Sequence, residues 1–258
     1  MTTTAGWQRP RPRATSARVW VRGALAALAI AGWAAGAAAQ PVEAARVRAA
    51  TIVFDEIMGA PDKGIPASVL HKAEGIAVFP GTLRGGFVVG AHYGRGILSV
   101  RDTKTGTWSP PAFLSLTGGS FGAQIGGQAI DVVLIIMSRM GLENLVRNEF
   151  KIGADAGVAA GPLGREAAAA TDIQMRAQIL SYSRARGLFA GVSLSGSSIR
   201  EDADANLAFY GAQLRTGDIV FDRKSGAPDP VAQWFATLAK HVHQQTAPTA
   251  PAAPPTAP

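Results

Sequence analysis

Residues 75 to 194 alternate short apolar runs with glycines, and this pattern restricts the fold of the chain more than any other feature. The runs include GIAVFP at 75–80, GGFVVGAHYGRGILSVR at 85–101 and the β-branched IDVVLIIM at 130–137. β-Branched residues favour strands, and glycines within strands typically mark bends, bulges or close backbone approaches. Because the chain has 30 glycines and only 7% aromatic residues, the sequence indicates a bent sheet with closely packed backbones.

The apolar runs divide this region into seven or eight expected strands. Short turns join consecutive strands, such as DTKTG at 102–106, so the pairing is expected to be mostly antiparallel. The expected strands are one at 75–80, two within 85–101, one at 112–116, one long segment over 121–137, one at 151–160 and two within 178–194.

Helical patterns flank the strands on both sides. Apolar residues recur at helical spacing over 42–58, and Asp229-Pro230 is a typical start for a last helix. That last helix carries one apolar face, which favours core packing: Val231, Trp234, Phe235, Leu238 and Val242. Shorter helices are expected at 66–71, at 141–148 with Ser138 as the cap, and at 201–210. We therefore predict an α+β fold, in which N- and C-terminal helices flank a curved or barrel-like, mostly antiparallel sheet.

The first 39 residues resemble a secretory signal peptide. A basic region with five arginines precedes the apolar stretch GALAALAIAGWAA at 23–35, and Ala37-Ala38-Ala39 fits the cleavage pattern. The apolar stretch is shorter than the roughly 20 residues that span a bilayer. We expect cleavage after Ala39 and a periplasmic or secreted mature protein, with an uncleaved anchor as the alternative.

Charge and composition divide the rest of the chain. The net charge of +7 comes largely from those five arginines, since the residues after them hold 20 basic and 18 acidic side chains. A nearly neutral body without Lys/Arg runs argues against nucleic-acid binding. We expect an N-terminal helical segment at 40–64, a domain at 65–245 and a disordered Pro/Ala/Thr tail at 246–258.

The chain has no cysteine, which excludes disulfides, thiolate metal sites and a lipid-modified N-terminal cysteine. Four histidines make a weak ligand set, and the His241-x-His243 spacing does not place both on one helix face. We expect neither a metal nor a cofactor.

The order of several sequence blocks resembles the SYLF family. They are IPASVLHKAEGIAVFP (65–80), GGFVVGAHYGRGILSVRD (85–102), GTWSPPAFLSLTGGSFGAQIGGQAIDVVLIIM (106–137), KIGADAGVAAGPLGR (151–165), RARGLFAGVSLSGSSI (184–199) and NLAFYG (206–211). The resemblance implies a lipid-binding module without a catalytic reaction; eukaryotic members bind phosphoinositides, and some bind actin. It also implies that bacterial members are exported, stand-alone proteins and that residues 42–58 occupy the place of a membrane-engaging helix. Because no SH3 or FYVE module is visible in the sequence, we do not expect actin to be a partner of this chain.

Five basic residues between 60 and 110 are the predicted lipid-binding site. Guanidinium groups beside exposed backbone N–H groups suit phosphate, and each cation near an anionic surface contributes about 1 kcal/mol. The residues are Lys72, Arg84, Arg95, Arg101 and Lys104, and an ordinary solvated face is the alternative. The expected partner is an anionic phospholipid membrane. A structural protein of the cell envelope with a protein partner is the second hypothesis.

A serine hydrolase is the third hypothesis. Gly118-Gly-Ser120-Phe-Gly122 fits the G-x-S-x-G motif, and Asp131 and His241 follow in the chain order of a catalytic triad. The glycine-rich and β-branched residues that follow do not fit the helix that this motif requires. Asp131 and Asp155 are also expected to take part in a polar network with Gln124 and Gln128 rather than in acid–base chemistry.

Overall fold

The computed structural model describes residues 42–60, 64–86, 89–121, 126–147, 149–153, 157–163, 176–185, 188–190, 194, 196–225 and 229–244. The proposed signal peptide and the proline tail lie outside these residues, as do Gln124 and Asp155. Helix 42–58 forms over the residues that its apolar spacing predicts. None of the helices within the described residues is both long and apolar enough to cross a bilayer.

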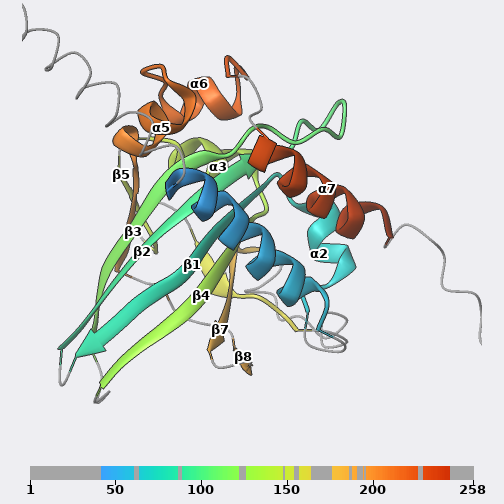
Figure 1. Cartoon of the computed structure of the whole chain (residues 1–258). Helices are drawn as coiled ribbons and strands as arrows, with labels where there is room; N and C mark the ends of the chain where they lie inside the picture. The colour runs from blue at the N-terminus through green and yellow to red at the C-terminus, as the bar shows by residue number, and fades with distance from the viewer. Residues whose placement is uncertain are drawn as a thin grey trace, which may run out of the picture.

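Nine strands of the described residues form one sheet, which curls behind the N-terminal helix in Figure 1. Neighbouring strands run in the order β5-β9-β3-β2-β1-β4-β7-β6, and β8 pairs with β7 beside β6. All pairs are antiparallel except β6 with β7. The strands are β1 Gly75–Gly86, β2 Val89–Val100, β3 Ala112–Phe121, β4 Gly126–Ile136, β5 Glu149–Lys151, β6 Val158–Ala160, β7 Ile179–Ala185, β8 Leu188–Ala190 and β9 Ser197–Glu201. The predicted α+β class and mostly antiparallel sheet are confirmed.

The first hairpin differs from the sequence prediction. The expected strand at 75–80 continues to Gly86 as β1, and the segment 85–101 holds one long strand, β2, in place of the two that were predicted. A bulge permits this continuity: the β1–β2 register shifts between Val78 and Leu83. Gly81 has a φ of 57°, and its N–H donates to the Asp131 carboxylate at 2.9 Å. Glycine tolerates this left-handed backbone without strain, so the strand bends and continues.

Both faces of the central strands are buried. One face packs against helix 42–58 and α7 (Asp229–Gln244), through residues that include Ile76, Val78, Ile97, Phe113 and Val133. The other face packs against α3 (Arg139–Leu145) and α6 (Thr216–Val220), through residues that include Phe79, Leu98, Leu114, Val132 and Leu134. Burial on both faces explains the continuous apolar run at 130–137.

The helices follow the sequence signals where caps are strong. Ser138 caps α3 by accepting a hydrogen bond from the Gly141 N–H at 3.1 Å, which confirms the predicted cap. Helix α2 (Ala67–Lys72) ends one residue beyond the predicted 66–71, and α5 (Ala203–Tyr210) falls within the predicted 201–210. On α7, the side chains of Val231, Trp234, Leu238 and Val242 are buried, as its apolar face predicts. Strand β9, helix α6 and most of strand β5 (Glu149–Lys151) were not predicted.

Candidate functional site

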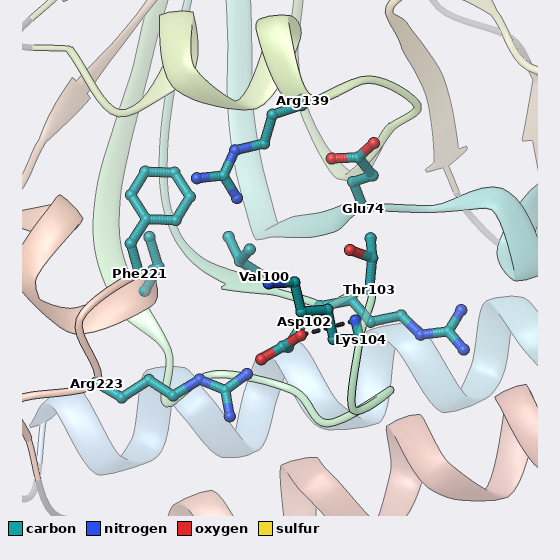
Figure 2. A pocket seen from close by; sticks show the side chains of 10 residues that line it. Glu74, Val100, Asp102, Thr103, Lys104, Arg139, Phe221 and Arg223 are labelled. Atoms are coloured by element: carbon teal, nitrogen blue, oxygen red, sulfur yellow. Dashed lines mark hydrogen bonds between the residues drawn. The ribbon is translucent and has the colours of Figure 1, made fainter.

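A basic pocket lies where β1 begins and β2 ends, and its volume is about 370 Å³. Figure 2 shows the side chains of Arg139, from α3, and Arg223, from the segment after α6, converging on it. Four cationic side chains line the pocket against two carboxylates: Arg101, Lys104, Arg139 and Arg223 against Glu74 and Asp102. The pocket therefore has an excess of positive charge.

The turn after β2 shapes one wall of the pocket. The Asp102 carboxylate accepts hydrogen bonds from the backbone N–H groups of Lys104 at 2.8 Å and Thr105 at 3.2 Å. These two hydrogen bonds, with a smaller effect of the Arg223 charge, hold the pKa of Asp102 below its ordinary value. The turn that DTKTG predicts is thus fixed by its first residue, and it places Lys104 at the pocket with its side chain exposed.

Two arginines of the pocket are held in place by neighbouring groups. The Arg139 guanidinium lies over the Phe221 ring, 4.3 Å from its centroid, and its Nε is 2.9 Å from the Glu143 carboxylate. Arg223 donates to the hydroxyl and the carbonyl of Thr107, at 2.8 and 3.0 Å. A guanidinium has five N–H donors, so both side chains keep donors for a ligand.

Arg101 and Lys104 complete the cationic set. Arg101 donates to the His71 carbonyl of α2 at 3.0 Å, and its buried Nε has no hydrogen-bond partner within the described residues. Lys104 forms no ion pair with any described residue. Three anchored guanidinium groups and one exposed ammonium group match the chemistry of a phosphate or a similar oxyanion.

The structure gathers two of the five predicted site residues, Arg101 and Lys104, in this pocket. Lys72 is exposed at the end of α2, next to His71, whose carbonyl binds Arg101. Arg139 and Arg223 were not predicted. No local sequence signal relates them to Arg101, because only the packing of α3 and α6 against the sheet brings them together.

Arg95 lies in an ion-pair network, away from the pocket. Its guanidinium donates to the Asp202 carboxylate at 3.0 and 3.2 Å and lies 3.6 Å from Glu43 of helix 42–58. Arg46 of the same helix binds Asp202 at 2.9 Å and Glu43 at 2.8 Å. These contacts give Arg95 a structural role, and its contact with lipid stays a prediction.

Arg84 lies at the far end of the sheet, where β1 pairs it with His92 and Gln128. It is half-buried and forms no ion pair with any described residue. Burial, with a smaller contribution from the Arg84 charge, lowers the pKa of His92. The five predicted residues therefore do not form one site.

The residues of the hydrolase hypothesis bind other partners. Ser120 lies within β3, paired with Gly90, and not at a strand-to-helix turn. Asp131 accepts hydrogen bonds from Arg184 at 2.8 and 3.1 Å, and His241 is 2.7 Å from the Asp55 carboxylate. The structure thus provides neither the nucleophile turn nor the triad. Asp131 makes polar contacts as predicted, with Gly81 and Arg184, whereas Gln128 is exposed.

A metal centre finds no support in the described ranges, where no group of three or more His, Cys, Asp or Glu side chains is placed to hold an ion. His241 packs edge-on against Phe54, with ring centroids 6.0 Å apart, in addition to its contact with Asp55. This histidine therefore belongs to the contact between α7 and helix 42–58. The basic pocket remains the candidate site.

Comparison with known proteins relates this chain to one family. The profile of the family described as "Ysc84: Las17-binding protein actin regulator" matches residues 117–241. The chain is 34% identical over 201 residues to yeast (Saccharomyces cerevisiae) LAS seventeen-binding protein 3, covering 76% of this chain and 42% of the relative. It is 34% identical over 216 residues to yeast Protein YSC84, covering 80% of this chain and 45% of that protein.

A human protein gives a similar match. The chain is 37% identical over 162 residues to human SH3 domain-containing YSC84-like protein 1, covering 62% of this chain and 47% of the relative. In all three alignments, the chain spans less than half the length of the curated relative. The similarity therefore concerns only a part of each of these longer proteins.

Proposed function

The chain carries a domain of the Ysc84/SYLF family, and from this premise we propose that it binds anionic phospholipid headgroups at a membrane surface. The family is known for lipid- and actin-binding modules and is generally non-catalytic. Binding at the basic pocket requires no chemistry from the protein beyond hydrogen bonds and charge.

The observation that carries the proposal is the excess of cations in a formed pocket. Arg139 and Arg223 are held by Phe221 and Thr107, so little side-chain freedom is lost when they bind a phosphate. Lys104, which also lines the pocket, adds an exposed ammonium group. Because four cationic side chains line one pocket, an oxyanion there can accept several charge-assisted hydrogen bonds at once.

We further propose that the protein acts outside the cytoplasm, in the periplasm or after secretion. The support is the basic region, the apolar stretch at 23–35 and the small residues before Gln40. The family description refers to Las17 binding and actin regulation, and the name of one longer yeast relative refers to LAS seventeen binding. That this chain binds no actin stays a prediction.

Reversing two pocket charges should weaken binding to anionic vesicles. In Lys104→Glu/Arg139→Glu, two cations of the pocket become anions. Each cation near an anionic surface contributes about 1 kcal/mol, so affinity should fall by roughly 30-fold or more. Co-sedimentation with phosphatidylglycerol/phosphatidylcholine vesicles at low salt measures the change.

The matched control is Arg176→Glu/Arg200→Glu, which makes the same change in net charge on residues that do not line the pocket. Arg200 is 57% exposed and paired with Glu149, much as Arg139 is 56% exposed and paired with Glu143. Equal losses in both double variants would mean that only net charge matters and that the pocket is not the site. If the protein without substitutions, prepared without residues 1–39, binds to no anionic vesicle, the proposed function itself is contradicted.

A further inference from the structure

Two large apolar side chains are exposed side by side at the far end of the sheet. Leu83 of β1 lies directly opposite Tyr93 of β2, and their exposed fractions are 62% and 49%. Leu83 is also aligned with Ala129 of β4. Side chains directly opposite in neighbouring strands share one face of the sheet, so these three residues form a patch, here named the strand-end patch.

The strand-end patch continues the face that the helices cover. Along β2, Ile97 lies under the helices, Arg95 pairs with Glu43 of helix 42–58, and Tyr93 follows on the same side two residues further. Figure 1 shows the long strands β1 to β4 extending well past the N-terminal helix. The helices therefore cover this face of the sheet only in part, and the side chains of Tyr93 and Leu83 lie beyond them.

The surface around the patch is hollow and largely apolar. A shallow groove of about 550 Å³ lies there, and small residues keep it open: Gly85, Ala91 and Ala129. Arg84 also borders the groove, and no described carboxylate pairs with it. The groove thus combines exposed apolar side chains with the phenol of Tyr93, and the neighbouring Arg84 adds one uncompensated cation on the opposite face of the same sheet end, beside His92.

Building on the proposed membrane-surface function, we propose that the strand-end patch enters the interfacial layer of an anionic bilayer. Tyrosine suits this layer because its ring is apolar and its hydroxyl group is polar. Arg84 complements anionic headgroups. A second copy of the chain is the less suitable occupant, because a stable interface buries about 800 Å² on each partner and this patch has only two large side chains.

The patch and the basic pocket lie at opposite ends of β2. Eight residues separate Tyr93 from Arg101, which corresponds to roughly 26 Å along a strand. Variants of one site therefore leave the other untouched. Loss of pocket binding should depend strongly on salt, whereas loss of patch insertion should not, because apolar transfer is not screened.

Fluorescent labels on single cysteines test the insertion directly, and the chain has no native cysteine to interfere. Leu83→Cys and Tyr93→Cys, each carrying an environment-sensitive fluorophore, should show a blue shift with anionic vesicles and quenching by brominated lipid. Leu207→Cys is the control, because Leu207 is 44% exposed on α5, away from the groove. It should respond little.

The other outcomes each have a clear meaning. If the labelled chains sediment with vesicles but the fluorophores at positions 83 and 93 show neither a blue shift nor quenching, the proposed insertion is wrong and the proposed headgroup binding is retained. If no labelled chain sediments with vesicles, both the proposed function and the proposed insertion are contradicted. If position 83 responds without vesicles, increasingly with protein concentration, a second copy covers the patch and the proposal is overturned.

Leu83→Asp gives a readout without a label. Because Leu83 would lose part of its favourable apolar transfer, this change should weaken vesicle binding roughly five- to tenfold. Leu207→Asp is the matched control and should change binding less than twofold. The same loss at low and high salt is expected, and an unchanged affinity of Leu83→Asp in a folded protein would contradict insertion at this position.

Discussion

Replacing Asp202 by asparagine is expected to lower the free energy of unfolding by about 3 to 5 kcal/mol. The Asp202 carboxylate joins Arg46 of helix 42–58, at 2.9 Å, to Arg95 of β2, at 3.0 Å. The side chains of Arg46 and Glu43 are only 8% and 6% exposed. Asparagine would leave two guanidinium groups with Glu43 as their remaining carboxylate, and burial of unbalanced charge is costly. Urea denaturation followed by circular dichroism measures the loss.

Asp204→Asn is the control for this change. Asp204 is exposed in the first turn of the same helix, α5, so its replacement removes an equal charge without opening the network. Loss of its favourable position near the helix N-terminus should cost no more than about 1 kcal/mol. Similar losses in both variants would mean that the buried network contributes nothing beyond the helix terminus.

The same network determines how stability depends on pH. Burial alone would raise the pKa of Asp202, but hydrogen bonds and charge from Arg46 and Arg95 outweigh it and lower the pKa. A lowered pKa contributes stability above the ordinary aspartate value, which is lost as the pH falls through the lower native value. Wild-type stability should therefore decline below about pH 4, and this decline should be smaller in Asp202→Asn.

Glu43 acts in the opposite direction. Burial raises its pKa, in spite of the attraction of Arg46 and Arg95, so its ionised form is disfavoured in the folded protein. This contribution favours the folded protein below the ordinary glutamate value and fades as the pH rises through the native value. The network is thus not uniformly stabilising, and Asp202 is the carboxylate on which it depends.

Local patterns predicted the class of the fold and the helices other than α6, because those depend on spacing along the chain. Helix 42–58 follows from its apolar residues, and the cap at Ser138 follows from its hydroxyl. The long β1 was divided in the prediction at Pro80, which lacks an N–H and commonly ends a strand. The bulge at Gly81 allows the strand to continue, and its hydrogen bond to Asp131, fifty residues away, has no local signal.

The candidate site was only half predictable. Counting cations in the sequence found Arg101 and Lys104, but it could not separate a cation available for a ligand from one already paired. Arg95 illustrates this limit: its carboxylate partners, Glu43 and Asp202, come from segments on either side of it in sequence. Pairing across such separations is decided by the register of the sheet and by the docking of the terminal helices.

Trp234→Ala is expected to lower the free energy of unfolding by about 3 to 5 kcal/mol, because it opens a large cavity between both terminal helices and the sheet. Trp234 is fully buried in α7, and its ring meets Phe54 of helix 42–58 edge-on, with centroids 5.6 Å apart. Its indole N–H donates to the Ser99 hydroxyl of β2 at 2.8 Å. Truncation removes the packing and leaves that buried hydroxyl without its donor. Urea denaturation measures the change.

Two further variants separate packing from the hydrogen bond. Trp234→Phe keeps most of the apolar volume and should lose less than alanine, with the Ser99 hydroxyl still left without its donor. The neighbouring Phe235 is only partly buried, so Phe235→Ala should cost clearly less than Trp234→Ala. Equal costs at positions 234 and 235 would contradict the role of Trp234. The expected order would mean that Trp234 holds α7 against both helix 42–58 and the sheet, through Phe54 and Ser99.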